Sequence, residues 1–272
     1  MDETAGCIVS MTVKGKTVIE RGAAFSLWRA PTDNDGVKGM AWDWESTWKP
    51  LGRWNKAGYN RLTETLESFD VAEKDGGIVI ASAHRYVGTD APKGFTHKAT
   101  YTLRNGKLHC SHSFIMDEGL TDVPRLGVRW DLAPGFEQLE WFGKGPLETY
   151  PDRQTAAVGR YRSTVTDQYV PYVLPQEHGH HEATRWLELS NGETTLRIAA
   201  CQRHFGFNAL HTTAEDLTAL THSHEVTPRP ETILYLDAVH RGLGTASCGP
   251  DTLPCYTIQS GTYTLDYAIA IP

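Results

Sequence analysis

Hydrophobic and polar residues alternate along much of this chain, which is the period of a β-strand with one buried face. Segments that alternate or are rich in β-branched residues are separated by turn-forming residues throughout. They cover residues 7–19, 76–87, 98–115, 194–200, 232–239 and 262–271. Short strands separated by turn signals favour antiparallel sheets packed as a sandwich, so we expect an all-β fold.

Turn signals inside two of these segments predict hairpins. The sequence KGK at 14–16 divides the first segment, and RNGK at 104–107 divides residues 98–115. Asn-Gly between two alternating runs is a strong hairpin signal, because both residues tolerate the left-handed backbone of a two-residue turn. The opening residues, DETAG at 2–6, read as the turn of a hairpin whose first strand is missing. We therefore expect an excised domain with an added initiator Met.

Helical patterns are rare in the sequence. Residues 211–220 (HTTAEDLTAL) predict one short helix with Thr212 or Thr213 as its N-cap. No fixed-period repeat and no low-complexity linker interrupts the chain. A length of 272 residues suits one large β domain or two ordinary domains. Without a linker, we expect residues 1–272 to form a single domain.

Composition and charge exclude several classes of function. Hydrophobic residues make up 40% and charged residues 22%, as in an ordinary folded domain. The net charge is −7 and no basic patch is interleaved with aromatic residues, so we expect no nucleic-acid partner. No apolar run approaches the ~20 residues of a membrane helix, so we expect no membrane partner. The first residues, MDETAGCIVSM, lack the pattern of a signal peptide, which favours a cytoplasmic location.

The cysteines predict no disulfide framework. Their number is odd and no two form a CxxC pair. They are Cys7, Cys110, Cys201, Cys248 and Cys255. Small buried or loop thiols are the expected state of all five.

Residues 26–54 are unusual because they hold five of the eight tryptophans beside the polar run TDNDG at 32–36. In an extended chain Trp42, Trp44 and Trp48 would share one face; in a helix only Trp44 and Trp48 would. Aromatic rings stack on the apolar face of sugars while short polar side chains bind the hydroxyls. The same residues would also pin a long loop onto the core of the sandwich. The stretch looks like loop, and the composition alone favours rings that pin the loop over rings that bind a sugar.

Paired carboxylates are the mark of glycoside hydrolysis, where two of them stand ~5–9 Å apart. Six carboxylates lie in loops flanked by Gly or Pro. They are Asp33, Asp35, Glu148, Asp152, Glu177 and Glu182. Each would equally well cap a turn by accepting backbone hydrogen bonds.

Histidines cluster at 178–182 (HGHHE) and at 222–225 (HSHE). If the second cluster were a strand, His222 and His224 would point to one face, as metal ligands do. Neither cluster has a third ligand at a characteristic spacing. Surface or hydrogen-bonded histidines are therefore expected, and we assign no metal site to this chain.

Four longer motifs occur in a fixed order along the chain. They are WRAPTDND (28–35), WFGKGPLETYPDR (141–153), YVPYVLPQEHGHH (169–181) and HRGLGTASCGPDTLPCY (240–256). Together they closely resemble the C-terminal domain of family 2 β-galactosidases. The same unit forms the bulk of the small subunit in heterodimeric β-galactosidases. The resemblance covers essentially the whole chain.

This resemblance implies a β-supersandwich of two large, mostly antiparallel sheets of the galactose-mutarotase-like kind. Enzymes of the family hydrolyse terminal β-D-galactosides such as lactose with retention. Their catalytic glutamates lie on a (β/α)₈ barrel that this chain lacks. The resemblance therefore implies that this chain contains no catalytic residue and is inactive alone. Its implied partners are the remaining domains or a large subunit, in an oligomeric enzyme. The magnesium and sodium sites of the family mostly use other domains, so no cofactor is expected in this chain.

In the family this domain closes one side of the substrate pocket with two loops, here 36–48 and 245–254. The best-known member carries a tryptophan in the second loop that stacks on the leaving sugar. The second loop of this sequence has no tryptophan, and the position of that tryptophan falls near Cys248 or Gly249. The substrate-binding residues implied are Asp35, Trp42, Trp44, Trp48, Cys248, Gly249, Asp251 and Thr252.

Two other functions fit the same kind of fold. A stand-alone aldose mutarotase or epimerase needs a general acid and a general base, for which His180, His181 and Glu182 are candidates. A free carbohydrate-binding module would use the tryptophan-rich stretch. The four motifs favour the β-galactosidase domain over both.

Overall fold

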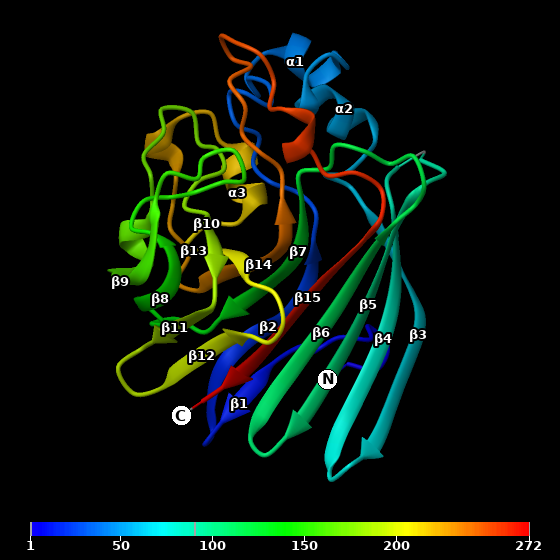
Figure 1. The fold of residues 1–272 in the computed structure, drawn as a ribbon, viewed down its shortest axis with the longest axis vertical. Coiled ribbons are helices and arrows are strands. Elements are labelled where there is room, and N and C mark those ends of the chain that lie inside the picture. The colour runs from blue at the N-terminus through cyan, green and yellow to red at the C-terminus, as the bar shows by residue number, and fades with distance from the viewer. Residues whose placement is uncertain (1, 90, 272) are drawn as a thin grey trace.

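The computed structural model describes residues 2–89 and 91–271, which form two antiparallel sheets packed face to face (Figure 1). In spatial order, the six-stranded sheet contains β1 (Met11–Val13), β2 (Lys16–Ser26), β7 (Arg125–Leu132), β14 (Thr232–His240), β13 (Phe205–Leu210) and β10 (His181–Thr184). The nine-stranded sheet contains β3 (Thr63–Lys74), β4 (Gly77–Val87), β5 (Gly94–Arg104), β6 (Lys107–Met116), β15 (Thr262–Ala270), β12 (Thr195–Ala200), β11 (Trp186–Ser190), β8 (Gln138–Gly145) and β9 (Ala157–Thr164). The predicted all-β sandwich is confirmed.

Helices are short and lie outside the sheets. They are α1 (Ala41–Glu45), α2 (Pro50–Lys56), α3 (Ala214–Ala219) and the 3₁₀ helices η1 (Thr166–Gln168), η2 (Ser223–Glu225) and η3 (Pro254–Tyr256). The predicted helix is α3, and Thr213 is its N-cap: the Thr213 hydroxyl accepts from the Asp216 N–H while the Asp216 carboxylate accepts from the Thr213 N–H. This reciprocal pair satisfies two of the donors that a helix start leaves free.

Both predicted hairpins form at the predicted turns. Lys14 and Gly15 join β1 to β2 with φ of 50° and 80°, and Asn105 and Gly106 join β5 to β6 with φ of 51° and 71°. Two consecutive left-handed residues give the turn whose twist matches that of the strands. The predicted turn near the start also forms, closed by an antiparallel bridge between Asp2 and Cys7.

The expectation that residues 26–54 form loop was wrong in part, because α1 lies within them and α2 begins at Pro50. Pro50 opens α2 at its first turn, where its missing N–H costs nothing, and this start signal was overlooked. The sequence pattern also missed β3. A bulge between Leu66 and Ser68 shifts its register against β4 and breaks the two-residue period on which the prediction relied.

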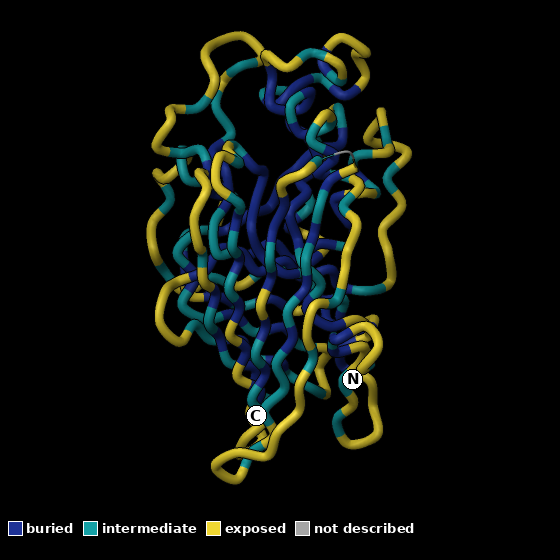
Figure 2. Tube along the Cα trace, turned by 90° about the vertical axis from the view of Figure 1, so that its right-hand side faces the viewer, coloured by how far each residue is buried: buried dark blue, intermediate teal, exposed yellow. Residues whose placement is uncertain are grey.

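The core lies between the two sheets, where the inward faces of the strands are buried (Figure 2). Trp130, Leu234 and Phe207 come from the six-stranded sheet, and Phe114 and Ile198 from the nine-stranded sheet; each is at most 1% exposed. Burying a side chain of this size stabilises a fold by ~1.5–3 kcal/mol. Figure 2 shows that buried segments continue from the strands into the loops at the top.

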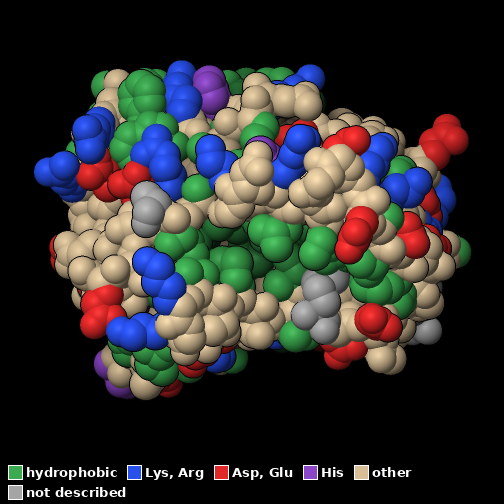
Figure 3. All heavy atoms as spheres, turned by 90° about the horizontal axis from the view of Figure 1, so that it is seen from below, with side chains coloured by type: hydrophobic (Ala, Val, Ile, Leu, Met, Phe, Trp, Pro, Cys, Tyr) green, Lys and Arg blue, Asp and Glu red, His purple; other side chains and the backbone are tan. Residues whose placement is uncertain are grey.

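The two ends of the sandwich differ. The end that carries α1, α2 and the loop before β15 is at the top in Figure 1. Seen from the opposite end, hydrophobic side chains gather in a hollow at the centre, and charged side chains lie around its rim (Figure 3). Among the described residues, no helix is long and apolar enough to cross a membrane.

A buried polar chain connects the two sheets inside the core. Tyr267 Oη accepts from Trp130 Nε1 at 2.9 Å and lies 3.1 Å from His112 Nε2, and His112 Nδ1 lies 3.0 Å from His97 Nε2. His112 has a partner at each ring nitrogen, and its imidazole can donate at one and accept at the other only when it is neutral. Burial favours the same state, because it lowers the pKa of His112 to about 3.

Replacing His112 should make the chain less sensitive to acid. The unfolded chain protonates this histidine near pH 6.5 and the folded chain only near pH 3, so stability falls as pH drops through that window, by about 1.4 kcal/mol per pH unit for each such group. We expect His112→Gln to lower the free energy of unfolding at pH 7. We also expect it to reduce the dependence of that free energy on pH by the equivalent of one proton. Urea unfolding between pH 4.5 and 7 measures both.

The control is His109→Gln, because His109 is exposed on the other face of the same strand. That variant should keep the slope of the parent chain. An unchanged slope in His112→Gln would show that this histidine contributes nothing to the acid sensitivity.

Candidate functional site

All four of the longer motifs meet at the loop end of the sandwich, the end formed by the loops around α1, α2 and residues 241–256. They surround a cavity of about 480 Å³. Its wall comes from residues 32–34, 148–153, 172–177 and 243–247. Segments more than 200 positions apart in the sequence, such as 32–34 and 243–247, are thus adjacent here. Antiparallel strands return their connecting loops to the same end of each sheet, which brings these segments together.

A buried ion pair holds the first of these segments. Arg29 donates from Nε and Nη2 to the two oxygens of Asp35, at 3.0 and 2.6 Å, and neither residue has exposed surface. Asp35 also accepts from the backbone N–H and the hydroxyl of Thr32, both at 3.0 Å. Arg29 further donates to the carbonyl oxygens of Arg241 and Gly242, at 2.8 and 3.1 Å. The pair therefore fixes the turn 32–35 and ties it to the loop after β14.

Arg241 extends this network to the opposite side of the loop end. It is fully buried, donates to both oxygens of Asp251 at 2.9 Å, and pairs with Asp122. Arg53 of α2 also pairs with Asp122. Burial by itself raises the pKa of the Asp122 carboxyl, but its hydrogen bonds and charge interactions with Arg241 and Arg53 outweigh burial and hold that pKa below its ordinary value. These charges join α2, the loop before β7 and the loop 241–256.

Two further side chains attach the loop 243–252 to its neighbours. Asn34 donates to the Gly244 carbonyl at 2.8 Å and accepts from Ser247. Asp152 accepts from the Gly244 N–H at 2.7 Å and the Thr252 hydroxyl at 2.7 Å. Gly244 has a φ of +67°, and a Cβ there would lie 2.6 Å from the Thr252 nitrogen. Only glycine fits at this point of close approach.

The carboxylates in the cavity wall are already engaged by the protein. Glu148 accepts from Arg153 at 2.7 Å, from the Tyr172 hydroxyl at 2.6 Å and from the Gly179 N–H at 2.8 Å. The buried Glu177 accepts from Asn208 at 2.9 Å. Asp33 is the least engaged, with one contact of 3.4 Å from Gln176. Backbone N–H groups of the described residues donate to Glu148, and to Asp152 above, but side chains alone donate to Glu177 and Asp33. The interpretation of these carboxylates as acceptors of backbone hydrogen bonds therefore holds only in part.

A buried polar cluster lies beneath the cavity, and the sequence analysis missed it. Arg125 donates to both oxygens of Asp237, at 3.0 and 2.5 Å, and to Asn208 at 3.1 Å. Arg125 Nη1 also lies 3.6 Å from Glu177. Burial by itself raises the pKa of Glu177, but the charge of Arg125 outweighs it and keeps the carboxyl ionised. The signal was present in the alternation of β7, RLGVRWDL, which places Arg125 on the face opposite the apolar residues.

The tryptophans of residues 26–54 divide into two groups. Trp28 and Trp54 are buried and pack edge to face at 6.1 Å, and Trp44 is half-buried with its Nε1 donating to the Lys38 carbonyl. Trp42 and Trp48 are each 69% exposed. Because α1 ends at Glu45, neither face predicted for these rings forms. Trp44 turns inward, while the rings on either side of it face outward.

The other residues expected to bind substrate also have distinct environments. Asp35 is completely buried in its ion pair, so it supports the loop and offers no exposed atom to a ligand. Cys248, Gly249 and Asp251 are exposed, and Thr252 is half-buried against Asp152. The structure thus brings the exposed face of the loop 245–254 to the same end of the molecule as α1 (Figure 1).

The histidine clusters do not form the arrangements considered from sequence. His224 lies in the exposed 3₁₀ helix η2 and His222 directly precedes it, so neither lies in a strand. His180 and His181 are buried, and their ring nitrogens contact Asn208, Glu182, Gln168 and the Lys144 carbonyl. They are therefore not presented in an open cleft, as the acid and base of a mutarotase would be.

Among the described residues, one group has the donor types of a metal site: His180, Asp237 and His240, whose ligand atoms lie within 4.8 Å of one another. Burial lowers the pKa of His240 to about 3, so its imidazole is neutral. Arg125, however, already donates to both Asp237 oxygens and supplies the positive charge that a metal would bring. The donor set therefore does not fit a resident cation.

Comparison with known proteins extends this description. The family described as "Beta galactosidase small chain" matches residues 1–270. The chain is 36% identical over 262 residues to a β-galactosidase of Arthrobacter sp. (strain B7), covering 90% of this chain and 25% of that protein. It is 29% identical to a β-galactosidase of Staphylococcus xylosus, covering 89% and 23%. The chain thus spans about a quarter of the length of these relatives.

A solved structure supports the fold. A galactose mutarotase-like protein from Lactobacillus casei ATCC 334 superposes with a TM-score of 0.53 over 100% of this chain and 96% of that one, at 12% sequence identity. The galactose-mutarotase-like sandwich implied by the motifs is confirmed.

Removing the charge of Asp35 should destabilise the loop end. We expect Asp35→Asn to cost ~3–5 kcal/mol, because it leaves the buried Arg29 without its counter-ion. The matched control is Asp33→Asn, two positions away, where the half-buried carboxylate has one weak contact and the loss should stay below ~0.5 kcal/mol. Urea unfolding at pH 7 compares the two. Equal losses for both variants would contradict the role given to this pair.

Proposed function

The chain belongs to the β-galactosidase small-chain family, and we propose that it is the C-terminal, substrate-shaping domain of an enzyme that hydrolyses terminal β-D-galactosides such as lactose with retention. The observation that carries this proposal is the convergence of the four family-like motifs around one cavity at the loop end. The proposed role is to close one side of a sugar pocket.

Catalysis would take place on carboxylates outside this chain. A retaining glycosidase needs a nucleophile and an acid/base about 5 Å apart, both open to the substrate. Glu148 and Asp152 each accept several hydrogen bonds that hold loops together, and Glu177 is buried beside Arg125. Such groups are poorly suited to exchange protons with a sugar. This supports the expectation that the chain alone is inactive.

Substrate contact would come from the exposed residues of two loops. Trp42 and Trp48 present their rings from the first loop. Cys248, Gly249 and Asp251 present a small polar surface from the second, with Thr252 beside them. The second loop carries no tryptophan, so we propose that Trp42 or Trp48 stacks on the leaving sugar in its place. Asp35 and Trp44 would not contact the sugar themselves and would instead hold the first loop in position.

The partners proposed for this domain are the barrel-containing part of the enzyme and the galactoside itself. The relatives' greater length supports this, since the chain matches about a quarter of each. The magnesium and sodium ions implied by the resemblance would be held by those other domains.

Activity measurements test the proposal directly. We expect the chain alone to leave a chromogenic β-galactoside intact, and a mixture with the matching barrel-containing fragment to hydrolyse it faster than that fragment does by itself. Hydrolysis by the chain alone would overturn the proposal and direct attention to Asp33, the least engaged carboxylate in the cavity wall.

The exposed tryptophans should influence substrate binding in the assembled enzyme. We expect Trp42→Ala or Trp48→Ala to raise KM for lactose about three- to tenfold, the equivalent of ~1 kcal/mol of lost stacking, without lowering Tm. The matched control is Trp186→Ala on β11, which removes a ring outside the loop end. If KM stays unchanged in both loop variants, these rings do not contact the sugar.

A further inference from the structure

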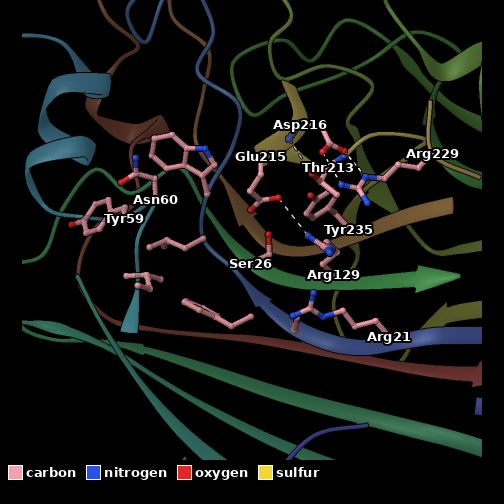
Figure 4. Close-up of a pocket in the computed structure, with 15 residues that line it drawn as sticks. Arg21, Ser26, Tyr59, Asn60, Arg129, Thr213, Glu215, Asp216, Arg229 and Tyr235 are labelled. Atoms are coloured by element: carbon pink, nitrogen blue, oxygen red, sulfur yellow. Dashed lines mark hydrogen bonds and ion pairs between the residues drawn. The ribbon is translucent and has the colours of Figure 1, made fainter. Parts of the chain in front are cut away.

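A second cavity, of about 460 Å³, lies on the outer face of the six-stranded sheet (Figure 4). Ser26 of β2 and Arg129 of β7 form its floor. Tyr59 and Asn60, which follow α2, form one wall, and Glu215 of α3 stands at the opposite wall. None of its lining residues belongs to the cavity at the loop end. We call it the side cleft.

The charges in the side cleft are almost balanced. Arg129 donates to both oxygens of Asp131, at 2.7 and 2.9 Å, and Arg229 donates to both oxygens of Asp216, at 2.5 and 2.7 Å. Each of these cations therefore already has a bidentate partner. Glu215 adds a carboxylate that is 65% exposed and makes one long contact, 3.4 Å, with Arg129. With Arg21 at the edge of the cleft, three cations face three carboxylates, and this balance favours a neutral ligand over an anion.

Several polar groups in the side cleft have no hydrogen-bond partner in the described part of the chain. The side-chain oxygen of Asn60 is buried and unpartnered. The hydroxyls of Ser26 and Tyr59 also lack a described partner, and Arg21 adds an exposed guanidinium at the edge. These groups offer both donors and acceptors, and a sugar hydroxyl can satisfy both kinds at once.

Apolar surface completes the side cleft. Trp28, Phe25 and Leu62 line it beside the polar groups. The Trp28 ring is held in place because its Nε1 donates to the Thr218 hydroxyl at 2.9 Å. A fixed apolar surface, a few polar groups and this volume are typical of a small-molecule site. We propose that the side cleft is an accessory binding site for a neutral saccharide, separate from the loop end.

Calorimetric titration of the 272-residue chain tests this inference, with lactose and D-galactose as probes and inorganic phosphate as the anionic comparison. We expect saccharide binding that Glu215→Ala and Asn60→Leu each weaken about tenfold, as the loss of one good hydrogen bond predicts. Glu215→Ala should fold normally because the side chain is largely exposed. The matched control is Glu193→Ala, which removes a carboxylate that is 66% exposed and paired only with Lys16 among the described residues; it should leave the affinity unchanged.

Three results would overturn the inference. The first is the absence of saccharide binding by the parent chain at millimolar concentrations. The second is saccharide binding that Glu215→Ala leaves unchanged, which would place the sugar elsewhere. The third is binding of phosphate in preference to either sugar. None of these results bears on whether the loop end completes a galactosidase. That proposal is tested by the β-galactosidase activity of the chain mixed with the barrel-containing fragment.

Discussion

The loop end of this protein depends on the buried pairing of Arg29 with Asp35. Two charges without exposed surface require nearly complete hydrogen bonding, since each would otherwise carry a large desolvation cost. The protein supplies it from the Thr32 turn on one side and from two carbonyls after β14 on the other. The turn 32–35 and the loop 241–256 are therefore held in one arrangement. The Leu51 N–H at the start of α2 also bonds to the Asp35 carbonyl, so both ends of the segment that carries Trp42 and Trp48 are joined at this turn.

The two faces of the six-stranded sheet have opposite chemistry. Its inner face is apolar and packs against the nine-stranded sheet, whereas its outer face carries Arg125, Arg129 and Asp237. Loops cover one part of that outer face and bury the charges there in pairs. Another part stays open and forms the side cleft. The same alternation of β7 and β14 thus produces both the core and the polar surface from which the two candidate sites are built.

Several acidic residues of the motifs accept hydrogen bonds that hold loops in place. Asp152 holds the loop 243–252, and Glu148 holds the segment around Gly179. Their engagement explains how a chain rich in loop carboxylates can belong to a glycosidase family and still be proposed to leave catalysis to another domain. What this chain contributes, on that proposal, is the fixed shape of a pocket wall.

The sequence by itself determined the sheet class, the hairpins at 14–15 and 105–106, and the family. These depend on local backbone preference and on contiguous motifs, which need no knowledge of distant residues. Only the tertiary structure decided which tryptophans are exposed, that Asp35 is buried, and that Ser26, Asn60 and Glu215 line one cleft. Such outcomes depend on contacts between residues far apart in the sequence. The two-residue period of a strand shows which residues share a face, but it does not show what covers that face.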